Sequence, residues 1–144
     1  MTRFETSVEI ARDREEVFEY VADPACFADW NSAVESVGAL PAPSPAAAAR
    51  YLMRRRLPTG WATNELVIDA GPPDHLTIRT TCGPTPFVYR YTFEPTDVGT
   101  LITLHADVRL GGAATVLGPL AAASVKRGVD ANFRTLREIL ERAA

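Results

Sequence analysis

The chain has 144 residues, enough for one domain with its own core and too few for two full-sized domains. Hydrophobic residues make up 47% and charged residues 23%, which excludes a disordered or fibrous chain. The net charge of −3 argues against a general nucleic-acid or anionic-membrane binder. Two cysteines make no disulfide framework, the residues Met1–Glu5 lack the apolar stretch typical of a signal peptide, and nowhere do about 18 apolar residues run together. We therefore expect a cytoplasmic domain over residues 1–144 with no membrane insertion.

The first strand and helix are predicted from alternation and a capping pattern. Apolar and polar side chains alternate from Phe4 to Ile10, the period of a half-buried strand. Asp13 and Glu16 have the spacing of a capping box, in which two side chains satisfy free N–H groups at a helix start. That helix should end near Ala22.

A second short helix and a weak strand follow. Asp23-Pro24 can start a new helical turn, because proline fits the first helical position. This helix carries Phe27 and Trp30, and a weak strand containing Val34 and Val37 comes next. The Pro- and Ala-rich stretch over residues 41–49 is predicted to be a loop inside the domain.

From Arg50 onward, turn signals recur at a spacing of about ten residues, which is typical of antiparallel strands and too short for helical crossovers. We expect four or five strands, punctuated by Pro58-Thr59-Gly60, Gly71-Pro72-Pro73-Asp74, Gly83-Pro84 and Asp97-Val98-Gly99. Residues from about Ala114 to Ala143 then show helical spacing of apolar side chains, with a start or kink at Gly118-Pro119. A helix from Pro119 to Ala143 would be about 37 Å long, enough to cross a whole sheet.

Alternation also assigns one face of each strand to the interior. The expected inward set is Tyr51, Met53, Arg55, Leu57, Ala62, Asn64, Leu66, Ile68, Leu76, Ile78, Thr80, Cys82, Phe87, Tyr89, Tyr91, Phe93, Ile102, Leu104, Ala106, Val108 and Leu110. One face of the sheet is therefore apolar and aromatic, and the other is polar.

The long helix offers mostly small side chains to that face. Ala121, Ser124, Gly128 and Asn132 lie on or beside its expected inward stripe, where a filled core would have larger residues. The alternative is close packing, with the aromatic row Phe87–Phe93 filling the gap. An empty, dry cavity of about 400 Å³ would cost roughly 10 kcal/mol, as much as a whole domain's stability. Any such space is therefore wet, open or occupied.

The order of these elements resembles the START-like (SRPBCC) superfamily, in its polyketide cyclase/dehydratase-like branch. The stretches that carry the resemblance are Val8-Glu9-Ile10, Glu16–Pro24, Trp30-Asn31, Tyr91-Thr92-Phe93-Glu94-Pro95 and Gly99-Thr100. The resemblance implies an α+β helix-grip fold. In this fold a curved seven-stranded antiparallel sheet wraps around a long C-terminal helix, and two short helices lie between strands 1 and 2. It also implies a ligand cavity between sheet and helix, although fold alone does not give chemistry.

The expected lining of this cavity combines apolar rings with a few polar groups. It consists of Phe27, Trp30, Tyr51, Met53, Arg55, Asn64, Leu66, Ile78, Thr80, Phe87, Tyr89, Tyr91, Leu104, Ala121, Ser124, Gly128 and Asn132. Arg55 is either a ligand anchor or a side chain that reaches solvent at the mouth. Tyr89 and Tyr91 either meet the ligand or only fill the core, and Trp30 either rims the pocket or is a core aromatic. Asn64 needs hydrogen bonds from a neighbour or a ligand.

We identify no catalytic or metal-ligating residues in the sequence. His75 and His105 fall on the outer face, as do Glu65, Asp69 and Asp107, so they are poorly placed for acid–base work on a bound molecule. Cys82 is expected to be a buried small hydrophobe and not a nucleophile. Neither a catalytic triad nor a phosphate loop is recognisable.

We therefore expect a binding module without a cofactor, whose partner is a hydrophobic or aromatic small molecule of lipid, polyketide or quinone type. The alternative is a polyketide cyclase, aromatase or dehydratase, in which tyrosine and arginine stabilise an enolate in the same cavity. A co-chaperone-like interaction domain would need an exposed apolar patch, which the outer-face residues do not show. A homodimer remains open.

Overall fold

The computed structural model describes residues 2–41, 44, 49–57, 60–109 and 118–142, and gives only the backbone for 118–122. In chain order the elements are β1 (Thr2–Ile10), α1 (Arg14–Ala22), the 3-10 turn η1 (Pro24–Cys26), α2 (Phe27–Trp30), β2 (Val34–Leu40), β3 (Arg50–Leu57), β4 (Gly60–Gly71), β5 (His75–Cys82), β6 (Phe87–Pro95), β7 (Thr100–Val108) and α4 (Gly118–Arg142). This order confirms the expected α+β helix-grip fold.

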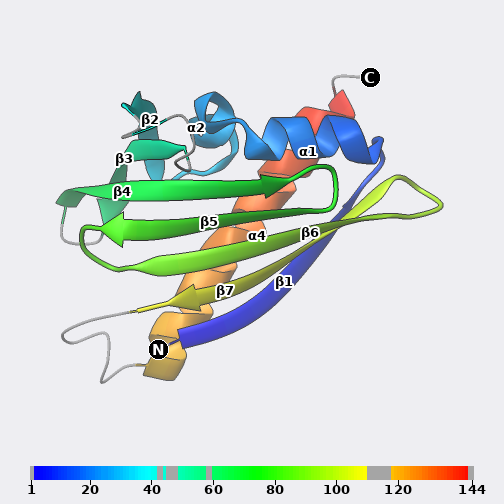
Figure 1. The fold of residues 1–144 in the computed structure, drawn as a ribbon. Helices are drawn as coiled ribbons and strands as arrows, with labels where there is room; N and C mark the ends of the chain where they lie inside the picture. Colours follow the sequence, from blue (N-terminus) through cyan, green and yellow to red (C-terminus); the bar gives the residue numbers. More distant parts are fainter. Residues whose placement is uncertain (1, 42–43, 45–48, 58–59, 110–117, 143–144) are drawn as a thin grey trace.

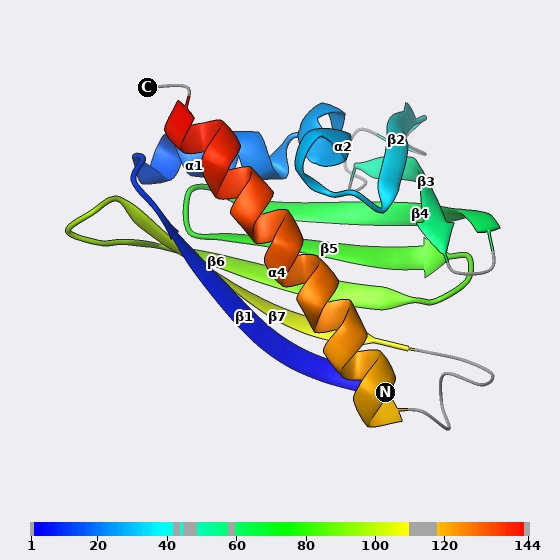
Figure 2. The ribbon, with the colours of Figure 1, turned by 180° about the vertical axis from the view of Figure 1, so that it is seen from behind.

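The described strands form one antiparallel sheet in the order β1-β7-β6-β5-β4-β3-β2. Strands β2 to β7 pair with their neighbours along the chain, as short turns between them require. Strand β1 pairs with β7, so β1 and β2 form the two edges of the sheet. The helix α4 runs diagonally across one face, and α1 and α2 cover one end (Figures 1 and 2).

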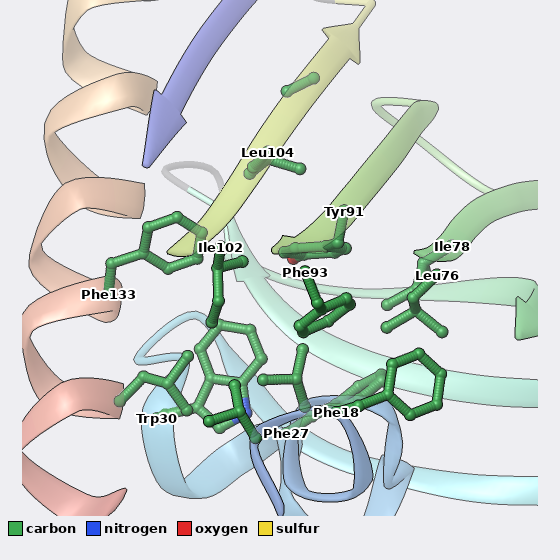
Figure 3. Packing of buried hydrophobic residues seen from close by; sticks show 14 of the residues in the cluster. Phe18, Phe27, Trp30, Leu76, Ile78, Tyr91, Phe93, Ile102, Leu104 and Phe133 are labelled. Atoms are coloured by element: carbon green, nitrogen blue, oxygen red, sulfur yellow. The ribbon is translucent and has the colours of Figure 1, made fainter. Parts of the chain in front are cut away.

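The alternation assigned from the sequence matches the burial on the inward face. On β7, Ile102, Leu104, Ala106 and Val108 are all buried, and the residues between them are not. Phe93 on β6 and Phe18 of α1 pack edge to face, with ring centroids 5.1 Å apart. Figure 3 shows this core, with Phe133 of α4 beside Ile102.

The C-terminal half of α4 is tied to the chain segments around it. Asn132 accepts hydrogen bonds from the backbone N–H and the hydroxyl of Ser32, at 3.2 and 3.3 Å. Near the helix end, Arg12 donates to the Leu140 carbonyl at 2.8 Å, and the Ala11 N–H donates to Glu141 at 2.9 Å. Together with the burial of Leu136 and Leu140, these bonds fix this half of the helix against the sheet.

Cys82 corrects one expectation from the sequence. A β-bulge interrupts the pairing of β4 with β5: Glu65 pairs with Cys82, but Leu66 already pairs with Thr80. The extra residue, Thr81, shifts the alternation by one, so Cys82 lies on the side of Glu65 and is exposed. The prediction that Cys82 faces inward as a buried hydrophobe is wrong.

The capping box is a second correction. Asp13 occupies the N-cap position of α1, but its side chain makes no capping hydrogen bond. Glu16 instead lies 3.7 Å from Arg12, one turn earlier, and this attraction competes with the reach back to the helix start. The next turn follows the prediction, because Asp23 caps η1 by accepting from the Ala25 N–H at 3.0 Å.

Candidate functional site

The two halves of α4 differ in how they meet the rest of the molecule. From Asn132 onward the helix buries Phe133, Leu136 and Leu140. Further upstream Ser124 and Gly128 are exposed, and a Cβ placed on Gly128 would meet nothing within 4 Å. This upstream part of the helix therefore carries small, exposed residues, whereas Val129 beside them packs against the core. Ala121, the remaining small residue of the expected stripe, lies outside the residues whose side chains are described.

The pairing register brings the predicted sheet residues together on one face. Tyr51, Leu66 and Thr80 are directly paired across β3, β4 and β5. Ile78 pairs with Tyr89, and Tyr91 pairs with Leu104. Met53 pairs with Asn64 beside the first row. Within this face Tyr51, Arg55, Thr80 and Tyr89 are only half-buried, so an aromatic and polar strip retains some exposure.

Arg55 lies at one end of this strip and is held by three neutral acceptors. Its Nε donates to Asn64 Oδ1 at 2.7 Å, and its Nη2 donates to the carbonyls of Pro84 and Thr85 at 2.8 and 2.9 Å. Its guanidinium lies 5.3 Å from the centroid of the Phe87 ring. Among the described residues no carboxylate pairs with Arg55. Desolvation lowers the pKa of Arg55, and the neighbouring Tyr89 acts in the opposite direction.

Asn64 completes this cluster from β4. It is fully buried, and its amide donates to the carbonyls of Cys82 and Pro84 at 3.2 and 2.9 Å. The loop that carries these carbonyls is sterically tight: Gly83 has a φ of +110°, and a Cβ there would lie 2.6 Å from the Asn64 amide nitrogen. Arg55 and Asn64 therefore fasten the β5–β6 loop, and they also place a half-buried cation beside the aromatic strip.

The two tyrosines of β6 are neutral hydrogen-bonding groups. Their rings meet edge to face with centroids 6.4 Å apart, and Phe87 lies 4.5 Å from Tyr89. Burial raises the pKa of both phenols. At neutral pH these hydroxyls remain protonated and can donate hydrogen bonds.

Three predicted lining residues lie deeper, between α2 and α4. Phe27 and Trp30 are buried and belong to the main core cluster. The Trp30 Nε1 finds no hydrogen-bond partner among the described residues. Asn132 is buried too, and its amide donates to Asn31 at 3.1 Å while its oxygen accepts from Ser32. Figure 3 shows Trp30 packed among Phe27, Ile102 and Phe133.

The outer face holds the groups that could have served as acids or bases. His75 and His105 are both exposed, as predicted, and His105 lies 3.6 Å from Glu5. Asp107 forms ion pairs with Arg3 and Arg90, at 2.8 and 3.1 Å. In the described part of the chain, no three His, Cys, Asp or Glu side chains are grouped so that they could hold a metal ion.

Sequence reasoning missed two grooves along β1. The larger has a volume of about 420 Å³ and lies between β1 and α4, lined by Thr6, Ser7, Val8, Glu9, Asp130, Phe133, Arg134 and Arg137. The smaller, about 300 Å³, is lined by Arg3, Phe4, Glu5, His105, Ala106 and Asp107. Neither includes a predicted lining residue. Asp130, which accepts hydrogen bonds from Thr6 and Lys126, closes one side of the larger groove.

Comparison with models of known protein families shows to which family this chain belongs. The model of the family "Polyketide cyclase / dehydrase and lipid transport" matches residues 1–141. The chain belongs to this family. Members of the polyketide cyclase / dehydrase and lipid transport family are START-like proteins, and membership implies a cavity for a hydrophobic ligand. A search among curated proteins finds no match to this sequence.

Solved structures of the same fold extend over the whole chain. A START superfamily protein from Mycobacterium smegmatis superposes with a TM-score of 0.82 at 13% identity, covering 100% of both chains. The protein TTHA0849 from Thermus thermophilus gives 0.80 at 16% identity, covering 99% of this chain and 98% of the other. The di-domain ARO/CYC protein BexL of the BE-7585A biosynthetic pathway gives 0.70 at 25% identity. This chain covers 48% of BexL and is itself 97% covered. Among the described residues, no helix is long and apolar enough to span a membrane.

Proposed function

We propose that residues 1–144 act as one START-like domain that binds a hydrophobic or aromatic small molecule between the sheet and α4. A lipid, polyketide or quinone has the required character, and binding involves no turnover. The observation that carries the proposal is the contrast between α4 and the sheet. Ser124 and Gly128 on α4 are small and exposed, while the sheet presents half-buried Tyr51, Tyr89 and Arg55. Partly exposed aromatic and polar side chains of this kind suit the binding of a small molecule.

The roles of the residues follow from their chemistry. Met53, Leu66, Ile78 and Leu104 supply apolar surface, and each 100 Å² that a ligand removes from water contributes about 2.5 kcal/mol. Arg55 and Tyr89 orient the ligand's oxygen atoms. Arg55 is charged and has no carboxylate partner among the described residues. A ligand with a carboxylate or enolate oxygen would therefore gain the most binding energy from it.

The alternative function is an enzyme of the polyketide cyclase, aromatase or dehydratase type. The observation that favours it is the Arg55 cation near the Tyr89 phenol, whose ring meets that of Tyr91, because these groups together could stabilise an enolate. The similarity to di-domain ARO/CYC proteins adds support. Against it, the described inward face offers no histidine or carboxylate to move a proton.

Gly128 provides a sharp test, because the same position accepts a small and a large substitution. Gly128→Trp should place an indole in the open space and reduce binding of a hydrophobic probe at least tenfold. Gly128→Ala is the matched control: it leaves the space open and improves helix propensity by about 1 kcal/mol. Binding is measured by titration with a fluorescent fatty-acid analogue, and native mass spectrometry of the purified protein reports any co-purifying ligand.

The outcomes separate the proposals. Equal probe affinity in both Gly128 variants would place the binding site elsewhere and refute the cavity. Unchanged affinity in Arg55→Ala and Tyr89→Phe would remove the proposed anchors. Turnover of a poly-β-ketone, lost in those two variants, would establish the enzyme.

A further inference from the structure

An exposed tryptophan lies between two arginines on the outer face of the sheet. Trp61 of β4 is 49% exposed. The guanidinium carbons of Arg54 and Arg56 lie 5.0 and 4.9 Å from its ring centroid. Leu52, on the same face of β3, is 42% exposed. We refer to Leu52, Arg54, Arg56 and Trp61 as the Trp61 patch.

The pairing register explains how these side chains come together. Arg56 is directly opposite Trp61 in the β3–β4 pair, and Arg54 is opposite Thr63, two positions along. Residues two apart in a strand share a face, so both guanidinium groups can reach the indole. Arg55, between them, points to the other face and joins the Asn64 cluster. The Trp61 patch and the candidate ligand site therefore lie on opposite faces of β3.

The charge around this patch is opposite in sign to that of the whole chain. Arg54 has one acidic neighbour, Glu35, at 3.6 Å, and Arg50 is paired with Glu65 at 2.8 Å. In the described part of the chain Arg56 forms no ion pair. Three arginines against two glutamates leave this region positive, whereas the chain as a whole carries −3.

The chemistry of the patch fits a membrane surface better than other partners. Indole rings favour the boundary between lipid headgroups and hydrocarbon, and guanidinium groups bind phosphate. A protein partner's anchoring side chain needs a pocket, and the grooves described above lie along β1, at the opposite edge of the sheet. Single-stranded nucleic acid needs successive aromatic rings, and the patch offers one.

We propose that the Trp61 patch docks the protein on the surface of anionic phospholipid membranes. The contact is peripheral: Trp61 and Leu52 enter the headgroup layer, and Arg54 and Arg56 bind lipid phosphates. The proposal is independent of what the cavity holds, because it uses the outer face of the sheet.

The protein carries its own reporter for this contact. It has two tryptophans, and Trp30 is only 4% exposed in the core. A blue shift of tryptophan emission on adding vesicles therefore reports Trp61. We expect the shift, and co-sedimentation, with vesicles of phosphatidylglycerol and phosphatidylcholine at 1:2. Binding to pure phosphatidylcholine vesicles should be at least tenfold weaker, and added salt should weaken binding to the anionic vesicles.

Two double variants separate the patch from overall charge. Arg54→Glu with Arg56→Glu should reduce binding to anionic vesicles at least tenfold. Arg127→Glu with Arg142→Glu changes the total charge equally at two exposed positions on α4 and should reduce it less than threefold. Trp61→Ala should abolish the emission shift, and circular dichroism confirms that each variant is folded.

Three results would overturn the proposal. The first is equal binding to neutral and anionic vesicles, or binding to neither. The second is an equal loss in the two double variants, which would mean that overall charge acts and the patch does not. The third is binding of oligo(dT) or of an acidic peptide without binding of vesicles, which would assign the patch to that partner.

Discussion

The hydrogen bond between Arg55 and Asn64 should be measurable as a coupling energy. Its Nε–Oδ1 distance is 2.7 Å, one partner is charged, and Asn64 is fully buried. Arg55→Met removes this bond and two to loop carbonyls, which should destabilise the fold by about 2–4 kcal/mol. Asn64→Leu removes the same bond, leaves the half-buried guanidinium short of one acceptor and takes one donor from each of two loop carbonyls, at a cost of about 3–5 kcal/mol.

The double variant should lose less than the sum of the single losses, because the shared bond is counted once in each. We expect a coupling of about 1–3 kcal/mol. Urea unfolding followed by far-UV circular dichroism gives the free energy of unfolding of all four proteins. Additive losses, within about 0.5 kcal/mol, would refute the reasoning that this bond fastens the β5–β6 loop.

Three further predictions concern single residues. Gly83→Ala should destabilise the protein by at least about 2 kcal/mol in urea unfolding, because Gly83 has a positive φ and no space for a Cβ. The control is Gly38→Ala: a Cβ at Gly38 would meet open space, so stability should change by less than about 0.5 kcal/mol. Burial acts to raise the pKa of Asp130, but hydrogen bonds from a threonine hydroxyl and a lysine ammonium outweigh it and lower the pKa. The stabilisation from Asp130 is therefore present above its unfolded pKa of about 3.9 and is lost as pH falls through the lower folded value. Wild type should lose stability relative to Asp130→Asn as pH falls below about 4, and parallel profiles would contradict this. Exposed Cys82 should react with Ellman's reagent faster than Cys26, because burial and the neighbouring Asp23 raise the pKa of the Cys26 thiol. If the fast phase of the reaction were unchanged in Cys82→Ser, the bulge register would be contradicted.

Local sequence patterns predicted most of the fold because strands such as β6 and β7 bury mainly one side. Alternation on β6 and β7 located Phe93 and Leu104 in the core, and helical spacing located Leu136 and Leu140. The turn residues predicted where each strand ends, because glycine, proline and aspartate favour turns through their own backbone conformation. The elements expected from these signals are confirmed by the structure.

The departures arise where distant residues decide the outcome. The exposure of Cys82 depends on how β5 pairs with β4, which the β5 sequence alone does not encode. The hydrogen bonds of Asn132 to the segment after α2, a hundred residues earlier in the chain, are likewise not encoded near Asn132, and its expected contact with a ligand stays a prediction. The hydrogen bonds from Arg55 to the loop carbonyls depend in the same way on the conformation of the β5–β6 turn, which lies about thirty residues away in the sequence. The contact of the predicted lining with a ligand stays a prediction.

The hydrogen bonds that attach α4 to its surroundings hold mainly its C-terminal half. Its described bonds to Ser32, Ala11 and Arg12 all involve residues from Asn132 onward. Upstream of these, the bond from Thr6 to Asp130 lies nearest the fixed half. A tilt of the segment around Gly128 would break the Thr6–Asp130 bond and the packing of Val129, and would leave the core around Leu136 intact. Guest molecules could then enter by this motion without any unfolding, and amide hydrogen exchange should be faster at Ser124–Gly128 than at Phe133–Leu140.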